Sequence, residues 1–537
     1  MVSSPHHLAS QAGLDILRHG GTVVDAAIAA AAVLTVVYPQ MCTLGGDAFW
    51  LIHNASTGET VGINASGRSG ERATRAFYAA LGLKAIPSRG PLAANTVPGI
   101  VSGWDAAWRY SRMRMGSQYP WAGLLACASD LAREGAPVSA SLAFWERRDA
   151  EDSDNVFGGL PRFSGFSETF LDGGKAFSAG EILRQPDLAR TFDRIAAGGA
   201  EEFYCGETAE RIVGGLAAEG GLLTLNDFAA HRADFVTPLT VGYRGFTACN
   251  LPPNTQGIAS LAILRILENF DVRDLWGAAM SDSPGADYYH VIVEATKLAF
   301  SDRDRWVTDP DFSEIPVTEI LSAGHARRQA ERIDMRRAQS FAAPLDPHGD
   351  TIWLGTADAA GNAVSMIQSV YHDFGSGFVP KGTGVLLQNR GCFFSLDPRA
   401  VNCLAPRKRT LHTLNPAMLL KDGRPYLVYG TMGGEGQPQT QTALATRIVD
   451  MGQGPGEAVD APRWLYGRAW GNADNDLKLE GRISNAVAEE LAHRGHRVTM
   501  VGEYDSLMGH AGAILYRKNG LLQGASDPRS DGAACGF

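Results

Sequence analysis

The chain has 537 residues, which is long enough for a large core or for several domains. Hydrophobic residues make up 45% and charged residues 20%, the proportions of an ordinary globular protein. The formal net charge of −10 argues against nucleic acid or an anionic membrane as a partner.

The seven cysteines are scattered and form no CxxC pair, so they indicate neither a disulfide framework nor a zinc site. The opening residues MVSSPHHLAS lack the basic and apolar regions of a signal peptide. The most apolar run, residues 26–39, is too short to span a bilayer and predicts a buried helix. We therefore expect a cytoplasmic protein.

The first 340 residues follow a mainly helical pattern. Apolar residues recur at helical spacing, and the first such run ends at Gly20-Gly21, as helices commonly do. A basic tract at 324–340 predicts a solvent-exposed helix face. The other expected elements, in chain order, are helices at 7–21 and 25–37, a hairpin at 45–66, a helical block at about 99–230, and helices at 257–270 and 286–307.

The pattern changes at residues 338–350, a segment with the composition of a loop. Strands then dominate, followed by two helices and a closing pair of strands. The strands are expected at 351–358, 363–370, 382–389, 416–422 and 425–434, and the helices at 437–452 and 484–494. Helices followed by strands fit either two domains or one layered α+β domain.

The stretch HGDTIWLGTADAAGNAVSMIQS, residues 348–369, predicts two strands around a turn at Gly361-Asn362. An ordinary hairpin requires no particular residue at Thr351, its first position. Three glycine-rich stretches, at 44–49, 374–384 and 430–439, also suggest sharp turns or close backbone approach. Each is weak on its own, because the chain contains 62 glycines.

In combination, these stretches match a family. The chain resembles the gamma-glutamyltransferase family of self-processing N-terminal-nucleophile hydrolases, and the resemblance covers nearly the whole chain in order. It rests on SPHHLASQAGLDILRHGGTVVDAAIAAAAVLTVVYP with LGGDAFW, then NTVPGIVSGW, GGLLTLNDF, LPPNTQG, EATKLAFSDRDRWVTDPDF, DTIWLGTADAAGNAVSMIQS, GTGVLLQN, RTLHTLNPAM, YGTMGGEGQPQ and DAPRW. The resemblance implies an α+β fold, a four-layer αββα sandwich.

The resemblance also implies that the precursor cuts itself between Asp350 and Thr351. Residues 1–350 would form the large chain and 351–537 the small chain, together one intertwined domain. An N-terminal threonine carries both a hydroxyl nucleophile and an α-amino base, whose pKa of about 7.7–8.0 suits proton transfer near neutral pH. Before cleavage that nitrogen is an amide, so processing and activation would be one event. No metal or organic cofactor is implied.

Other roles follow residue by residue from the resemblance. Gly433 and Gly434 match the pair whose backbone N–H groups form the oxyanion hole. Ser369 stands where the family has a threonine hydroxyl beside the nucleophile. Substrate-binding positions fall on Tyr371 and on His412 and Thr413, which replace two serines that hold the substrate α-carboxylate. A structural, hydrogen-bonded role for His412 is the alternative.

Three departures from the family pattern concern the substrate. Phe393 replaces the acidic residue that pairs with the substrate α-amino group, and Arg390 stands three residues earlier in place of a neutral amide. Ser66 occupies the position of the carboxylate-binding arginine, although Arg68, two residues on, would lie on the same strand face. A solvent-facing salt bridge is the alternative role for Arg390.

A pocket that has lost a carboxylate and acquired a guanidinium favours a substrate with a carboxylate and no α-amino group. We therefore expect a small-molecule amide of an ω-carboxy acid, such as an oxamate-like or glutaryl-like compound, as in the acylase and oxamate amidohydrolase-like members of the family. One alternative is a true gamma-glutamyl hydrolase or transferase acting on glutathione. A remote alternative is a non-catalytic binder of small acids. A homodimer stays open.

Overall fold

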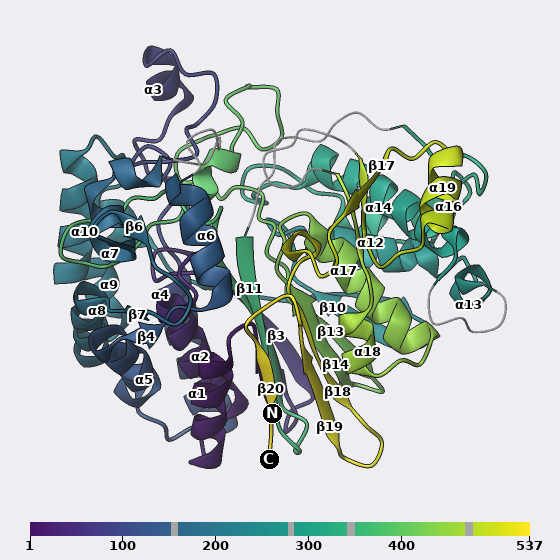
Figure 1. Ribbon diagram of the computed structural model, residues 1–537, viewed down its shortest axis with the longest axis horizontal. Helices are drawn as coiled ribbons and strands as arrows, with labels where there is room; N and C mark the ends of the chain where they lie inside the picture. Colours follow the sequence, from purple (N-terminus) through teal and green to yellow (C-terminus); the bar gives the residue numbers. More distant parts are fainter. Residues whose placement is uncertain (152–158, 278–283, 341–349, 468–475) are drawn as a thin grey trace.

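The computed structural model describes residues 1–151, 159–277, 284–340, 350–467 and 476–537. Two β-sheets lie face to face and are enclosed by helices on both outer sides, which gives the four layers of an αββα sandwich (Figure 1). The α+β class and the layered arrangement expected from the resemblance are confirmed. Among the described residues, no helix is long and apolar enough to cross a membrane.

The first sheet is antiparallel, and it combines strands that precede residue 350 with strands that follow it. The first and last strands of the chain pair at one edge, so the two termini lie side by side (Figure 1). Its order is β20 (Ala533–Cys535), β1 (Val2–Ser4), β11 (Asp350–Ala357), β12 (Ala363–Tyr371), β2 (Asp47–Asn54), β3 (Glu59–Ala65) and β8 (Asp234–Val236).

The second sheet is also antiparallel, and it too combines strands that precede residue 350 with strands that follow it. Its order is β19 (Leu522–Ser526), β18 (Ala511–Tyr516), β14 (Arg424–Thr431), β13 (Ala417–Lys421), β10 (Phe246–Asn250) and β9 (Leu239–Tyr243). Because both sheets interleave strands from the two sides of residue 350, the helix-rich and strand-rich parts of the sequence do not form separate domains.

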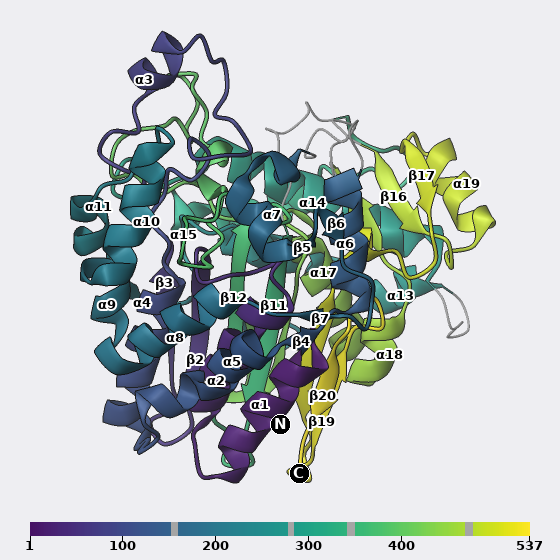
Figure 2. The same ribbon diagram turned by 60° about the vertical axis from the view of Figure 1, so that its left-hand side comes forward.

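Helices α2 (Val23–Val37) and α4 (Ile100–Tyr110) pack directly on the first sheet, and α1 (His7–Arg18), α5 (Trp121–Glu134) and α8 (Pro186–Gly198) extend that layer (Figure 2). On the second sheet lie α12 (Gly257–Leu267), α17 (Gly436–Ala445) and α18 (Pro455–Asp460), with α14 (Ala286–Trp306) behind α12 and α17.

Shorter elements complete the described chain. The remaining helices are α3 (Arg75–Ala80), η1 (Ser111–Met115), α6 (Ala140–Glu151), η2 (Leu160–Arg162), α7 (Ser164–Phe170), α9 (Ala200–Cys205), α10 (Glu207–Ala218), α11 (Leu225–Ala230), α13 (Val272–Trp276), α15 (Val317–Ile320), α16 (Ala323–Ala330), η3 (Arg390–Phe393), η4 (Thr446–Asp450), α19 (Asn485–His493) and η5 (Ser506–Met508). The remaining strands are β4 (Ala136–Pro137), β5 (Leu171–Asp172), β6 (Lys175–Ala176), β7 (Ile182–Leu183), β15 (Trp464–Tyr466), β16 (Leu477–Glu480) and β17 (Val498–Val501).

The alanine-rich run seen in the sequence is helix α2, and every one of its residues is buried. A helix that is apolar on all sides needs neighbours on all sides, and α2 has them in α1, α5 and the first sheet. Its start is defined by a capping box, in which Thr22 Oγ1 accepts from the Asp25 N–H while Asp25 accepts from the Thr22 N–H.

A separate apolar core fills the space between the sheets. Trp353 of β11 is the largest side chain in it, and its indole N–H donates to Ser365 Oγ at 2.9 Å. The backbone of Gly430 on β14 approaches the same ring so closely that a Cβ there would lie 2.1 Å from Trp353 Cδ1. Small residues opposite the indole therefore set the spacing of β11 and β14, the strands that lead into the candidate site.

Two expectations for the local elements were wrong. Residues 382–389 form no strand: Gly382 and Gly384 have φ of 74° and 64°, which breaks an extended run, and only Leu387 makes a β-bridge, to Gly45. The basic tract 324–340 is helical only as far as Ala330, so its expected helical extent was wrong. The solvent exposure expected for it is confirmed, because all five of its arginines are exposed. Of the loop expected at 338–350, residues 341–349 lie outside the described residues.

Candidate active site

Thr351 lies near the start of β11, a central strand of the first sheet, and is 1% exposed. The pairing of β11 with β12 is irregular here, because Asp350 pairs with Tyr371 whereas Ile352 pairs with Gln368. Thr351 is the residue at this β-bulge, and bulges often redirect a side chain beside an active site. The strand order thus places Thr351 opposite the end of β12.

The end of β12 carries Ser369 and Tyr371. The Tyr371 N–H donates to Ser369 Oγ at 2.8 Å, and Tyr371 has a φ of 85°. A non-glycine residue in this region is uncommon, and it turns the strand end so that the phenol ring faces Arg390. The structure therefore brings Thr351, Ser369 and Tyr371 to one end of the β11–β12 pair.

Gly433 and Gly434 form the turn between β14 and α17, with φ of 114° and 52°. Only glycine adopts the first of these angles readily. In the part of the chain that the structure describes, neither backbone N–H of the pair meets an acceptor. Two adjacent donors in such a turn can bind an anionic oxygen.

Arg390 opens the 3-10 helix η3 and is 1% exposed, so the alternative of a solvent-facing salt bridge does not fit. Its guanidinium carbon lies 3.4 Å from the centre of the Tyr371 ring and 5.2 Å from that of Phe393. Both terminal nitrogens donate to Thr413 Oγ1, at 3.3 and 3.4 Å. Among the described residues, no carboxylate forms a salt bridge with it.

Burial lowers the pKa of Arg390, and the electrostatic attraction of Tyr371 offsets part of this effect. The guanidinium is nevertheless a cation at neutral pH, because arginine deprotonates only in strongly basic solution. A buried cation stacked on aromatic rings with no carboxylate partner is a strong binding group for an incoming carboxylate.

His412 is hydrogen-bonded on both ring nitrogens. Its Nδ1 accepts from the Leu414 N–H at 3.3 Å, so its Nε2 carries the proton and donates to Asp47 Oδ2 at 3.1 Å. Burial, and then the positive charge of Arg390, lower the pKa of His412 to about 4. The neutral imidazole of His412 is held by two hydrogen bonds. This arrangement fits the structural, hydrogen-bonded role that was the alternative to substrate contact.

Arg68 is in a different environment from Arg390. Its guanidinium pairs with Asp309 at 2.9 Å and with Asp311 at 2.7 Å, and its side chain is one-third exposed. Two carboxylates already balance its charge. Of the two candidate arginines, the geometry favours Arg390 as the carboxylate-binding group.

Sequence reasoning assigned no role to Gln256, which joins two site loops. Its Nε2 donates to the carbonyl oxygens of Thr413 at 2.7 Å and Gly434 at 2.8 Å. Its Oε1 accepts from Arg303 Nη1 at 2.9 Å, and Arg303 also pairs with Glu435 at 2.5 Å. The LPPNTQG motif was visible in the sequence, but the convergence of two loops on one side chain was not.

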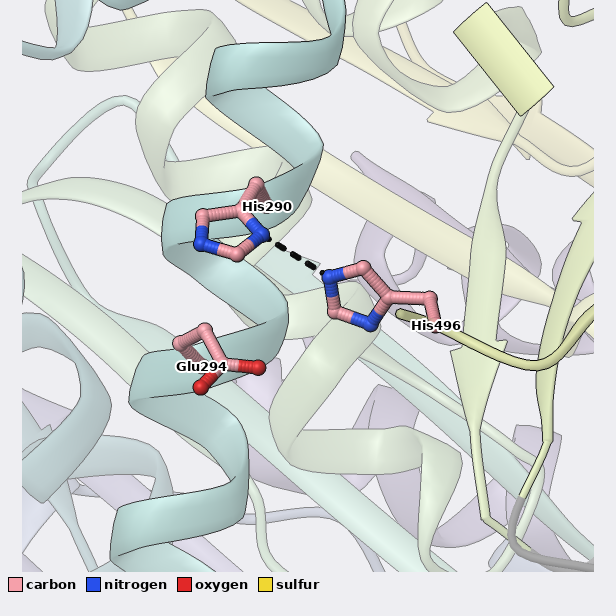
Figure 3. A group of neighbouring side chains, drawn as sticks. All are labelled: His290, Glu294 and His496. Carbon is pink, nitrogen blue, oxygen red and sulfur yellow. Dashed lines mark hydrogen bonds between the residues drawn. The ribbon is translucent and has the colours of Figure 1, made fainter. Parts of the chain in front are cut away.

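One group in the described chain brings metal-ligating atoms together, and it lies outside this site. His290 and Glu294, one turn apart on α14, face His496 (Figure 3). The histidines are hydrogen-bonded to each other at 2.9 Å, and Lys297 pairs with Glu294 at 2.6 Å. The Lys297 ammonium, bound to the Glu294 carboxylate, would repel a metal ion placed between these side chains. The arrangement therefore does not fit a metal site.

Comparison with known proteins identifies the family. The model of the gamma-glutamyltranspeptidase family matches residues 9–537. The chain belongs to this family. It is 45% identical to a glutathione hydrolase-like YwrD proenzyme from Bacillus subtilis and 47% identical to an oxamate amidohydrolase proenzyme from Klebsiella pneumoniae, each over 100% of this chain and 98% of the relative. The crystal structure of a cephalosporin acylase from Bacillus halodurans superposes with a TM-score of 0.88, at 36% identity over 99% of this chain and 94% of the other.

Membership in the gamma-glutamyltranspeptidase family confirms the resemblance on which the fold and the class of reaction were predicted. The chain is an amidohydrolase with the N-terminal-nucleophile hydrolase fold. Both relatives from the sequence comparison are named as proenzymes. Their names differ in substrate, so membership in the family does not by itself define the substrate of this chain.

Proposed function

We propose that the chain cleaves itself between Asp350 and Thr351 and then hydrolyses an amide whose acyl group carries a second carboxylate. The observation that carries the substrate assignment is Arg390: a buried guanidinium, stacked on Tyr371 and without a carboxylate partner among the described residues. The name of the Klebsiella pneumoniae relative supports it, since oxamate is such an amide.

In the proposed mechanism, the Thr351 hydroxyl attacks the amide carbonyl while the free α-amino group of Thr351 accepts its proton. The oxygen that becomes negative lies against the N–H groups of Gly433 and Gly434. The C–N bond then breaks, and the departing amine takes the proton. Water attacks the resulting ester, releases the acid and restores the threonine.

The substrate carboxylate would form hydrogen bonds with Arg390, and no existing salt bridge of Arg390 would have to break. Phe393 stands where a gamma-glutamyl enzyme has an acidic residue, and its ring faces the guanidinium at 5.2 Å. A substrate ammonium placed there would meet an apolar ring and a cation rather than a carboxylate. The amine-free acid is therefore the better fit.

The test compares the wild type with Thr351→Ala and Thr351→Ser. Mass spectrometry of the wild type should find two chains, 1–350 and 351–537, and the protein should hydrolyse oxamate or a glutaryl amide. Thr351→Ala should stay one chain and lose turnover, whereas Thr351→Ser, which keeps a hydroxyl, should retain both at a reduced rate. A single-chain wild type that still turns over substrate would contradict the mechanism.

Glutathione is assayed beside the two amine-free amides. Faster release of glutamate from glutathione than of acid from either amide would reject the substrate assignment and support a gamma-glutamyl hydrolase or transferase. The name of the Bacillus subtilis relative makes this the alternative to exclude. Binding of small acids without turnover by a fully processed protein would reject catalysis altogether.

A further inference from the structure

A buried polar cluster lies in the helical layer behind the second sheet. It consists of His290 and Glu294 on α14 and of His496, which precedes β17 (Figure 3), together with Lys297, also on α14. All four side chains are at most 5% exposed. Burying two charges and two imidazoles costs free energy unless each is paired, so the contacts of this cluster need an explanation.

Those contacts converge on one peptide segment, Asp334–Gln339. His290 Nε2 donates to the carbonyl of Asp334 at 2.9 Å. Glu294 Oε2 accepts from the Gln339 N–H at 3.0 Å, and Lys297 Nζ donates to the Gln339 carbonyl at 3.0 Å. The Glu294–Lys297 ion pair thus binds both the N–H and the carbonyl of Gln339.

The hydrogen bonds also define the protonation of the histidines. Because His290 Nε2 donates to a carbonyl, its Nδ1 is the acceptor for His496 Nε2–H at 2.9 Å, and His496 Nδ1 faces the Lys297 ammonium at 3.5 Å. Both imidazoles are neutral, in agreement with burial, which lowers the pKa of His496 to about 3. Every member of the cluster is engaged with another or with the segment.

The cluster draws on both sides of the proposed cleavage site. His290, Glu294 and Lys297 precede Thr351, as does the segment that they hold, whereas His496 follows it. Near His496, the Arg494 carbonyl accepts from the Ala338 N–H at 2.7 Å, and the Arg494 guanidinium pairs with Asp287 at 2.7 Å. Residues 340–350 are the part of the sequence that connects Gln339 to Thr351.

We propose that His290, Glu294, Lys297 and His496 form a docking site for the backbone of Asp334–Gln339, which anchors the large chain ahead of the scissile bond and fastens it to the small chain. The role in joining two chains rests on the proposed cleavage before Thr351. The docking itself does not, because the same contacts exist in the uncut chain.

Hydrogen exchange at the Gln339 amide tests the docking directly. The amide should be protected in the wild type and equally in the uncut Thr351→Ala variant. In the double variant Glu294→Leu/Lys297→Met, which removes both charges together and leaves no unpaired ion, exchange at Gln339 should become at least about tenfold faster. Glu319→Gln, which changes an exposed glutamate, is the matched control and should leave the protection intact.

An unprotected Gln339 amide in the wild type would overturn the proposal without any variant. Unchanged protection in the double variant, with peptides elsewhere also unchanged, would overturn it as well. Freeing Asp334–Gln339 lengthens the tether before Thr351 by about half, so self-cleavage should slow only about twofold. A wild type that is never cut, but in which Gln339 is protected, would reject the proposed function and keep the docking site.

Zinc provides a second readout. Titration of the wild type with Zn²⁺ should show no stoichiometric binding that requires His290 and His496, because Lys297 already occupies the carboxylate of Glu294. Stoichiometric binding that is lost in His496→Gln would overturn the docking assignment and make the cluster a metal site.

Discussion

Arg390 forms no salt bridge with a carboxylate among the described residues, and the attraction of Asp47 offsets only part of the effect of burial on its pKa. Its guanidinium has aromatic rings on two sides, and both of its terminal nitrogens donate to the Thr413 hydroxyl. Removing a guanidinium from water costs several kcal/mol, and only part of this is recovered from stacking on Tyr371. In the proposed function a substrate carboxylate would supply this salt-bridge partner, so substrate binding would relieve a cost already present in the free protein.

We predict that Arg390→Gln raises the KM for a carboxylate-bearing amide by about 10- to 100-fold, since a hydrogen bond to a charged group contributes about 1.5–3 kcal/mol. The matched control is Arg68→Gln, which removes the same charge from a position where Asp309 and Asp311 already neutralise it. Steady-state kinetics on both variants decides between the arginines. A larger effect from Arg68→Gln would transfer the carboxylate site to Arg68.

Gln256 contacts the candidate site through the backbone of other residues. Its amide fixes the carbonyls of Thr413 and Gly434, and the latter belongs to the turn that would hold the oxyanion. We predict that Gln256→Leu lowers kcat by about 10- to 100-fold and changes KM less than about threefold, because a loosened donor matters most in the transition state.

The control for this prediction is Gln118→Leu, since Gln118 is exposed and its side chain donates to the nearby Gly116 carbonyl. A rise in KM with unchanged kcat in Gln256→Leu would assign Gln256 to substrate binding instead of positioning. If both variants lose folded protein to the same extent, Gln256 has neither a binding nor a positioning role.

At the scale of elements, the candidate site depends on how closely β11 and β14 approach. The Trp353 indole lies between them, and three glycines, Gly355, Gly430 and Gly512, have backbones against its ring. A rigid ring held by a hydrogen bond to Ser365 cannot move aside easily. Added volume must therefore separate the strands.

We predict that Gly430→Ala destabilises the protein by about 1–3 kcal/mol, the usual cost of overpacking a core. Because β14 leads directly into Gly433 and Gly434, activity should fall as well. Gly242→Ala on β9 is the control: a Cβ there meets nothing within 4 Å, so its stability should stay near that of the wild type. Urea unfolding measures both variants, and equal midpoints would contradict the packing argument.

The elements that sequence patterns predicted best are those that a local period defines. Helix α2, the hairpin of β2 and β3, and strands β11 to β14 lie close to their expected positions. The strand expected at 382–389 was wrong because its apolar run is buried by a loop, and burial alone does not distinguish a strand from a buried loop.

The position of a candidate residue was predictable where it has a fixed place in the chain, as Thr351 has at the start of β11 and Gly433 at a turn with positive φ. It was not predictable where the role depends on partners distant in sequence. Asp309 and Asp311 neutralise Arg68, Asp47 orients His412, and no local pattern announces either contact.

At the scale of the whole molecule, burial holds several histidines in the neutral form. Burial is the main cause in each case, and it lowers the pKa to about 3 for His6 and His496 and to about 4 for His231, His412 and His510. In the unfolded chain each would titrate near 6.5. Between these values the unfolded state binds more protons than the folded state.

Stability should therefore fall as the pH decreases from 7.5 to 5.0. Each such histidine contributes up to about 2 kcal/mol to the loss at pH 5. Glu146 opposes the trend, because burial raises its pKa to about 8 and the folded protein takes up that proton first. Burial also raises the pKa of Asp450 and Asp531, which act in the same direction as Glu146. The five histidines outnumber these carboxyls, so the net change should be a loss of stability, seen as a falling urea midpoint.

His6→Asn isolates one histidine from this sum. The His6 side chain caps α1 by accepting from the Leu8 N–H, and asparagine can make the same cap without titrating. The variant should match the wild type at pH 7.5 and exceed it at pH 5.0 by up to about 2 kcal/mol, because its unfolded state no longer takes up that proton. If the difference in the free energy of unfolding between the two proteins does not change with pH, neutral burial of His6 is not a source of acid sensitivity. The pH dependence must then arise from carboxylates such as Asp527. Burial raises the pKa of Asp527, but its neighbours, chiefly Arg463 and Arg529, lower it by more.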